Sequence, residues 1–147
     1  MVSEENIARL RAYLELWNGR KLRPEERPWE QVFSHEPATA LIGTDTVYVD
    51  NNLPDHTGEE YRGRDGIRRA AERWIEGFEW LLVELLEIID ADDRLVSVHR
   101  GRVKARHTGM EFEFPLAYVY TLREGQLIRC QSFADVGDAL KAAGLKE

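Results

Sequence analysis

An imidazole, a thiol and a hydroxyl interrupt a predicted sheet face that is otherwise apolar and aromatic. These side chains belong to His99, Cys130 and Ser132. A histidine ring titrates near neutral pH, so it can give or take a proton in an active site. The cysteine has no evident activating base, and we expect it to be a small core residue rather than a nucleophile. The pattern therefore indicates acid/base chemistry at His99 or, alternatively, a core histidine that only satisfies its hydrogen bonds.

This face depends on the register of a predicted antiparallel run of strands between Asp93 and Asp135. A turn at His107-Thr108-Gly109-Met110 would place His99 opposite Tyr118. A second turn, predicted as a three-residue loop with a bulge at Gly125, shifts the alternation by one residue. A slip of one residue would exchange the two faces, so the apolar pattern defines which side is buried. The residues then expected on the apolar face are Phe112, Phe114, Leu116, Tyr118, Ile128, Cys130 and Ser132.

The elements around this run follow from hydrophobic periodicity. A helix after Ser3 and another that begins near Gly63 show apolar residues at helical spacing, and Trp80 to Ile89 reads as a long apolar strand. A strand at Thr46 to Asn51 is followed by a polar loop, residues 51–62, of a kind that often covers a binding site. Helices on one face of a mainly antiparallel sheet define the α+β class.

The composition limits the possible partners. The chain has 147 residues, which is the size of one domain, and we treat residues 1–147 as a single unit. Its net charge of -7 argues against nucleic acid or an anionic membrane, because both require a basic surface. One cysteine excludes an internal disulfide and no secretion signal is evident, so we expect a cytoplasmic protein. No apolar run reaches the roughly 20 residues that cross a bilayer. No cluster has the spacing of metal ligands, and we expect no metal or other cofactor.

Four segments recur together, in this order and spacing, in one known family. They are Tyr48-Val49-Asp50, Tyr61 to Ile67, Tyr118 to Leu127, and Phe133-Ala134-Asp135 followed by Ala139-Leu140. In these segments the chain resembles the SnoaL-like polyketide cyclase branch of the nuclear transport factor 2-like superfamily. The resemblance implies a strongly bent mixed sheet that forms a cone, capped by the N-terminal and middle helices, with an apolar pocket inside. It also implies that Tyr48 and Asp50 point into the pocket, whereas alternation alone would bury the neighbouring valines.

The resemblance shows in addition which side chains differ from those of characterised relatives. In the limonene epoxide hydrolases, an arginine and an aspartate two residues apart combine with an aspartate on the last strand to activate water. The matching positions here are His99, Gly101 and Ser132. The cyclases are similar in that they use the last-strand aspartate as an acid/base. Neither mechanism can be transferred intact to this chain.

From these residues and the resemblance we predict a cofactor-independent acid/base lyase, isomerase or hydrolase that acts on a small, mostly apolar molecule. Asp50 would be the general base and His99 the acid or electrophile, since an apolar pocket raises the pKa of a carboxyl group toward that of an imidazole. Gly101 would leave room for substrate beside His99. The ligand-binding residues expected on the pocket wall are Tyr48, Trp74, Phe78, Phe114, Leu116, Tyr118, Cys130 and Ser132.

Two other functions agree with the same sequence. One is a non-catalytic protein whose pocket holds a small hydrophobic ligand, in which case Asp50→Asn or His99→Ala would change only affinity. The other is a homodimer in which the outer sheet face is the functional surface. That face is expected to carry Val96, Val98, Val119, Leu127 and Phe133.

Overall fold

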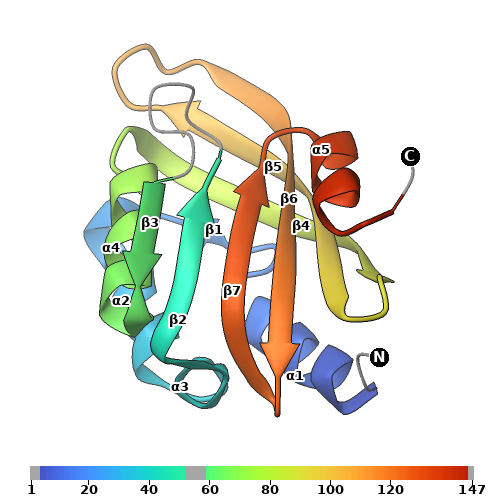
Figure 1. Ribbon diagram of the computed structural model, residues 1–147. Coiled ribbons are helices and arrows are strands. Elements are labelled where there is room, and N and C mark those ends of the chain that lie inside the picture. The colour runs from blue at the N-terminus through green and yellow to red at the C-terminus, as the bar shows by residue number, and fades with distance from the viewer. Residues whose placement is uncertain (1–3, 52–58, 146–147) are drawn as a thin grey trace.

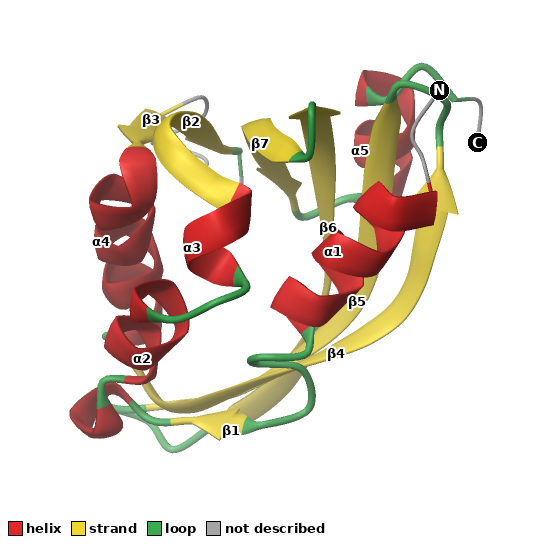
Figure 2. Cartoon of the chain, turned by 90° about the horizontal axis from the view of Figure 1, so that it is seen from below, coloured by secondary structure: helices red, strands yellow, loops and turns green. Residues whose placement is uncertain are grey.

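A strongly bent sheet encloses most of the helices (Figures 1 and 2). The computed structural model describes residues 4–51 and 59–145. Within these residues the sheet has seven strands in the order β1-β4-β5-β6-β7-β2-β3, all antiparallel except for the pairing of β2 with β7. The predicted α+β class, with a bent mixed sheet and capping helices, is therefore confirmed.

The strands and helices have the following bounds. The strands are β1 (Lys21–Leu22), β2 (Ile42–Asp50), β3 (Glu59–Arg62), β4 (Phe78–Asp90), β5 (Arg94–Ala105), β6 (Glu111–Arg123) and β7 (Gln126–Phe133). The helices are α1 (Glu4–Leu14), α2 (Pro28–Ser34), α3 (Ala38–Leu41), α4 (Gly63–Ile75) and α5 (Val136–Ala142), with a short 3-10 turn at Pro24–Glu26. No helix within the described residues has the length and apolar character needed to span a membrane.

The helices α1 to α4 lie on the concave side of the sheet, and α5 lies on the outer side (Figures 1 and 2). The main core fills the concave side and includes Leu10 of α1, Trp29 of α2 and Leu81 of β4. A separate, smaller core forms between α5 and the outer face of the sheet. The concave side is therefore where a pocket among apolar side chains can form.

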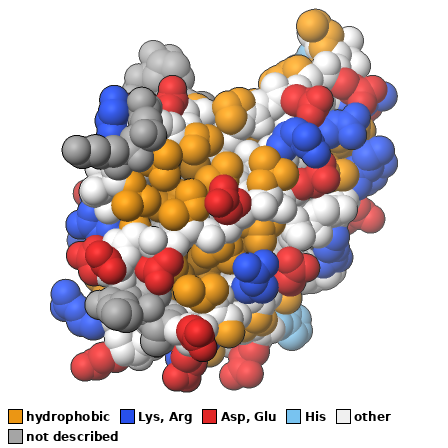
Figure 3. Space-filling view, turned by 90° about the vertical axis from the view of Figure 1, so that its right-hand side faces the viewer, with side chains coloured by type: hydrophobic (Ala, Val, Ile, Leu, Met, Phe, Trp, Pro, Cys, Tyr) orange, Lys and Arg blue, Asp and Glu red, His pale blue; other side chains and the backbone are white. Residues whose placement is uncertain are grey.

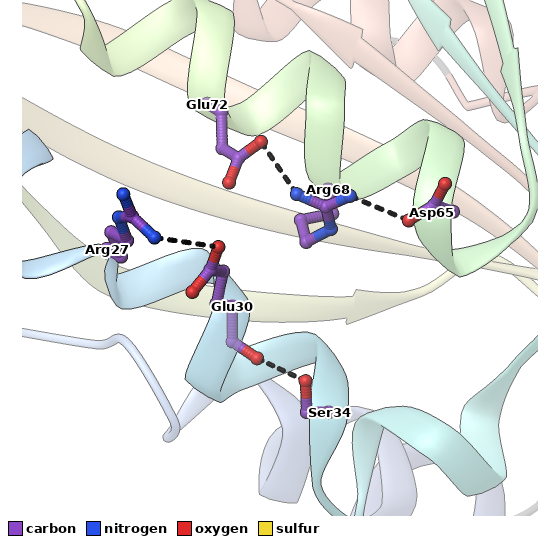
Figure 4. A network of polar contacts seen from close by, with 6 residues as sticks. All are labelled: Arg27, Glu30, Ser34, Asp65, Arg68 and Glu72. Atoms are coloured by element: carbon purple, nitrogen blue, oxygen red, sulfur yellow. Dashed lines mark hydrogen bonds and ion pairs between the residues drawn. The ribbon is translucent and has the colours of Figure 1, made fainter.

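The outward surfaces of α2 and α4 are polar. Arg68 of α4 lies between Asp65 and Glu72 at 2.7 and 2.8 Å, and Arg27 contacts Glu30 of α2 at 3.8 Å (Figure 4). Such exposed ion pairs each contribute about 0 to 1 kcal/mol. They mark the solvent sides of both helices, so that the apolar sides of α2 and α4 are left to pack inward.

The hairpin between β5 and β6 differs from the predicted register by two residues. His99 lies opposite Leu116 rather than Tyr118. The loop comprises residues 106–109, one residue earlier than predicted, because its last residue is Gly109, which adopts the left-handed conformation with φ of 69°. Moving a turn by one residue moves every pairing by two, so the predicted alternation of faces is kept. The prediction that Phe112 is buried is wrong: it lies near the hairpin end of β6 and is 49% exposed.

The turn between β6 and β7 also differs from the prediction. It is a two-residue loop of Glu124 and Gly125, both left-handed with φ of 52° and 79°, and not a three-residue loop. The irregularity of the ladder falls within β7, where Ile128 is the extra residue. As a result Leu127 and Cys130 are both buried, whereas Ile128 is 39% exposed. The predictions of an inward Ile128 and an outward Leu127 are therefore wrong.

The segment after β2 is partly a strand. Glu59–Arg62, predicted as the end of a polar loop, pairs with β2 as strand β3. Ser3 and residues 52–58, which belong to the predicted cap of the first helix and the predicted loop, lie outside the described residues.

The outer sheet face is less exposed than its sequence indicated. Val96 and Val119 are buried beneath α5, against Ala139. Asp135, the residue before this helix, caps it: its carboxylate accepts a hydrogen bond from the N–H of Asp138 at 3.2 Å. The prediction that Val96 and Val119 form an exposed apolar surface is wrong, because a helix covers them.

Candidate functional site

An apolar cavity of about 80 Å³ lies between the helices and the concave face of the sheet. The helices contribute a predominantly aromatic part of its wall, which includes Tyr13, Phe33, Trp29 and Trp74, together with Trp17 from the turn after α1. The sheet contributes most of the polar groups, which are Tyr48, Asp50, Tyr118, Tyr120 and Cys130. A cavity of about 150 Å³ is known to take up benzene. A ligand of that size therefore requires the wall side chains to move apart.

Asp50 is the one charged residue among the described residues that line this cavity. It is the last residue of β2, and the parallel pairing of β2 with β7 places it beside Ser132. The hydroxyl of Ser132 donates to Asp50 Oδ1 at 3.3 Å. Tyr48, two residues earlier on the same strand, also lines the cavity. Both side chains thus lie where the family resemblance implied, and not where simple alternation of the valines would have put them.

The hydroxyl and thiol groups of the wall are held in their protonated forms. Burial raises the pKa values of Tyr48, Tyr118 and Tyr120 well above 10, and the neighbouring Asp50 carboxylate adds to this for Tyr48 and Tyr118. Burial likewise raises the pKa of the Cys130 thiol. At neutral pH the three phenols are therefore neutral hydrogen-bonding groups, and the thiol has the character of a buried core residue.

His99 lies behind the cavity wall and not in it. Its side chain is 1% exposed, and its ring is 5.5 Å from the ring of Trp17 and 5.5 Å from that of Tyr118, two residues that do line the cavity. Its Nε2 atom is 2.7 Å from Ser97 Oγ, and this oxygen is 2.9 Å from the hydroxyl of Tyr120. Burial lowers the pKa of His99 to about 4, so the ring is neutral at pH 7.

The structure brings some of the predicted site residues together and separates others. Besides Asp50, the predicted ligand-binding residues on the cavity wall are Tyr48, Trp74, Tyr118 and Cys130. Ser132 reaches the site through its hydrogen bond to Asp50. Phe78, Phe114 and Leu116 pack into the main core without lining this cavity.

The space beside Gly101 is filled by the protein itself. A Cβ atom added to Gly101 would overlap the ring of Phe114, which lies across from it on β6. The prediction that Gly101 leaves room for substrate is therefore wrong, since an aromatic ring from the neighbouring strand occupies that space.

Two polar residues near the site were not identified from the sequence. Tyr120 lines the cavity, and Ser97 joins it to His99. The available signal was the alternation along each strand, because Tyr120 shares its face with Tyr118, and Ser97 shares its face with His99. Among the described residues, no group of three His, Cys, Asp or Glu side chains could hold a metal ion.

Taken together, a bent sheet, helices on its concave side and an apolar cavity with a few polar groups give the architecture of a pocket protein. Residues 10–130 match the SnoaL-like domain family, and the chain belongs to this family. No curated protein matches the chain in sequence.

Three solved structures illustrate the similarity of fold. TerC co-crystallised with polyporic acid is 17% identical, with a TM-score of 0.67 over 96% of this chain and 99% of that one. A nuclear transport factor 2-like protein of unknown function from Burkholderia pseudomallei is 16% identical, with a TM-score of 0.67 over 95% and 97%. A candidate SnoaL-like polyketide cyclase from Jannaschia sp. CCS1 is 17% identical, with a TM-score of 0.64 over 100% and 99%. At these identities the similarity establishes the fold and not the activity.

Proposed function

We propose that this protein binds a small, mostly apolar molecule in the cavity and converts it by cofactor-independent acid/base chemistry, with Asp50 as the general base. The observation that carries the proposal is the position of Asp50, a single carboxylate in an aromatic wall. An isomerase, a cyclase and a hydrolase all need a base that takes a proton from carbon or water, and a carboxylate that lines an apolar cavity is placed for that task.

The surrounding groups support this role for Asp50. Ser132 holds one carboxylate oxygen, which fixes the orientation of the group. Neutral phenols on the same wall can stabilise negative charge that develops on a ligand oxygen during the reaction. His99 does not line the cavity, so any contribution that it makes to the reaction must pass through Ser97 and Tyr120.

The test begins with the molecule that the protein itself selects. Protein purified without added ligand is denatured and extracted, and the extract is analysed by mass spectrometry for a co-purifying small molecule. Turnover of that molecule and of its close analogues is then measured for the unsubstituted protein, for Asp50→Asn and for Asp45→Asn. Asp45 is the matched control, because it is an exposed aspartate on the same strand.

We expect Asp50→Asn to lower turnover at least about 100-fold, the usual contribution of a general base, while affinity changes little. Asp45→Asn should leave both quantities unchanged. Equal turnover by the unsubstituted protein and Asp50→Asn would refute the proposal. A molecule that binds tightly and is converted by no variant would instead favour the alternative, a non-catalytic protein for a small hydrophobic ligand. The mostly apolar wall is the observation that favours this alternative.

We also propose that two copies of the chain associate through the outer face of the sheet. Apolar side chains gather across the middle of the side that carries α5 (Figure 3). Several apolar residues beside this helix are only partly buried, and they include Val98, Phe133 and Leu140. Light scattering should give about twice the chain mass of 17.0 kDa, and the mass of a single chain would refute the dimer.

A further inference from the structure

We propose that the hydroxyl of Tyr120 donates a hydrogen bond to an acceptor atom of the cavity ligand, and that Ser97 and His99 are positioning residues that orient this hydroxyl. The ligand class is thereby narrowed to apolar molecules that carry a hydrogen-bond acceptor, such as a carbonyl oxygen. This inference deepens the proposed function and rests on the cavity being the ligand site.

The three residues form one hydrogen-bonded chain that begins in the core and ends at the cavity. His99 Nε2 lies 2.7 Å from Ser97 Oγ, and Ser97 Oγ lies 2.9 Å from the Tyr120 hydroxyl. His99 and Ser97 are fully buried and lie outside the cavity wall, whereas Tyr120 lines it. Tyr120 is therefore the member of the chain that a ligand can reach.

The surroundings of His99 determine which groups donate and which accept in this series of hydrogen bonds. A neutral imidazole carries one N–H, and His99 Nδ1 is buried without a hydrogen-bond partner among the described residues. The three groups carry three hydrogens and share two hydrogen bonds, so one donor is left over in either tautomer. With the hydrogen on Nδ1, that donor would lie in the core against the rings of Trp17 and Tyr118. With the hydrogen on Nε2, it is the hydroxyl of Tyr120, a residue that lines the cavity and can meet an acceptor there. The hydrogen therefore belongs on Nε2, from which it is donated to Ser97 Oγ.

This direction determines what Tyr120 can offer. Ser97 accepts the hydrogen bond from His99 and then has its own hydrogen to donate to the oxygen of Tyr120. The hydrogen of the Tyr120 hydroxyl is left without an acceptor, since within the described part of the chain this hydroxyl bonds only to Ser97. Burial holds the pKa of Tyr120 well above 10, so the hydrogen is retained at neutral pH. A buried donor without a partner is unfavourable, and a ligand acceptor would relieve that cost.

The strand pairing places this donor apart from the carboxylate. Across the ladder, Tyr120 lies opposite Cys130, and Ser132, two residues along β7, pairs with Asp50. Two strand spacings of about 4.8 Å therefore separate the strands that carry Tyr120 and Asp50. One small molecule can then meet the donor with one end while another part of it faces Asp50.

The test uses two probes of the same shape, acetophenone and α-methylstyrene, which differ in having C=O or C=CH₂. Dissociation constants are measured from the fluorescence of the tryptophans that line the cavity, and the ratio of the two constants is compared between variants. Differences in hydration between the probes cancel in this comparison. We expect Tyr120→Phe to shift the ratio about ten-fold against acetophenone, the usual loss for one buried hydrogen bond, with α-methylstyrene bound as before.

Variants of Ser97 and His99 test whether these residues orient the Tyr120 hydroxyl or only stabilise the fold. Ser97→Ala and His99→Leu should shift the ratio in the same direction as Tyr120→Phe. His99→Gln should shift it much less than His99→Leu, because the glutamine amide can still donate a hydrogen bond to Ser97. Tyr61→Phe is the control, because the Tyr61 hydroxyl bonds to Arg73 outside the cavity, and it should leave the ratio unchanged. Nitrogen-15 NMR of the unsubstituted protein should show the hydrogen of His99 on Nε2.

Each other outcome rejects a specific statement. A hydrogen on His99 Nδ1, or a ratio that Tyr120→Phe leaves unchanged while both probes bind, would overturn the assignment of Tyr120 but leave the cavity as the ligand site. If neither probe bound up to its solubility limit, the cavity would be rejected as the ligand site, and the proposed function would fail with it.

Discussion

Acidification is predicted to destabilise this protein through one buried side chain, His99. Its ring is enclosed by the aromatic rings of Trp17 and Tyr118, and no carboxylate of the described residues shifts its pKa in the opposite direction. Burial lowers the pKa from 6.5 to about 4 in the folded state. Between these pH values the unfolded chain binds a proton at His99 that the folded chain does not. The folded state therefore loses stability as the pH falls from about 6.5 towards 4.

The size of the effect follows from that shift in pKa. A difference of one pKa unit corresponds to about 1.36 kcal/mol, so the interval between pH 7 and pH 4 should cost about 3 kcal/mol at this residue alone. The total stability of a domain is about 5 to 15 kcal/mol, so the loss is a large fraction of it. Above pH 7 the contribution is constant, because His99 is then neutral in both states.

The assay is urea unfolding, followed by tryptophan fluorescence, at several pH values between 7 and 4. His99→Gln removes the titrating ring, and the free energy of unfolding of this variant should fall by about 3 kcal/mol less over the interval than that of the unsubstituted protein. His107→Gln is the matched control, since His107 is exposed in the loop between β5 and β6, and it should follow the unsubstituted protein. If His99→Gln lost as much stability as the unsubstituted protein over this range, burial of His99 would not be the cause of the acid sensitivity.

Two substitutions test the strand connections and pairings. Gly101→Ala should lower the free energy of unfolding by about 1 to 3 kcal/mol, because the new methyl group overlaps the ring of Phe114. Adding Phe114→Leu should recover part of this loss. An unchanged free energy of unfolding in Gly101→Ala would contradict the overlap. Glu124→Asn should raise the free energy of unfolding by about 0.5 to 1 kcal/mol, since asparagine adopts the left-handed conformation of this two-residue turn more readily than glutamate. Urea unfolding measures both, and an unchanged midpoint for Glu124→Asn would argue against strain at that residue.

The strand pattern was read correctly where the period of two was regular. His99, Cys130 and Ser132 are buried on the predicted face, although the β5–β6 register differs by two residues. Ile128 was misplaced because a bulge adds a residue inside β7, and the sequence carries no local mark of where such a residue falls. In the same way α5 covers Val96 and Val119, which alternation alone cannot distinguish from exposed valines.

The candidate site was predicted in part. The family resemblance correctly placed Asp50 and Tyr48 on the cavity wall, against the simple alternation of their strand. His99 was expected to face a ligand, and the structure places it behind Trp17 and Tyr118, with a hydrogen bond to Ser97. A period of two identifies the inward side of a strand but not whether helical side chains fill the space in front of it.

The sequence by itself determined the α+β class, the inward face of the long strands and the SnoaL-like family, because local periodicity and short segments encode them directly. Only the tertiary structure decided which inward side chains reach the cavity. That choice depends on contacts between elements distant in the chain, such as Trp17 against His99 and the parallel pairing that brings Ser132 to Asp50. Packing thus divides an imidazole, three hydroxyls and a carboxylate into two separate hydrogen-bonded groups, one around Ser97 and the other at Asp50.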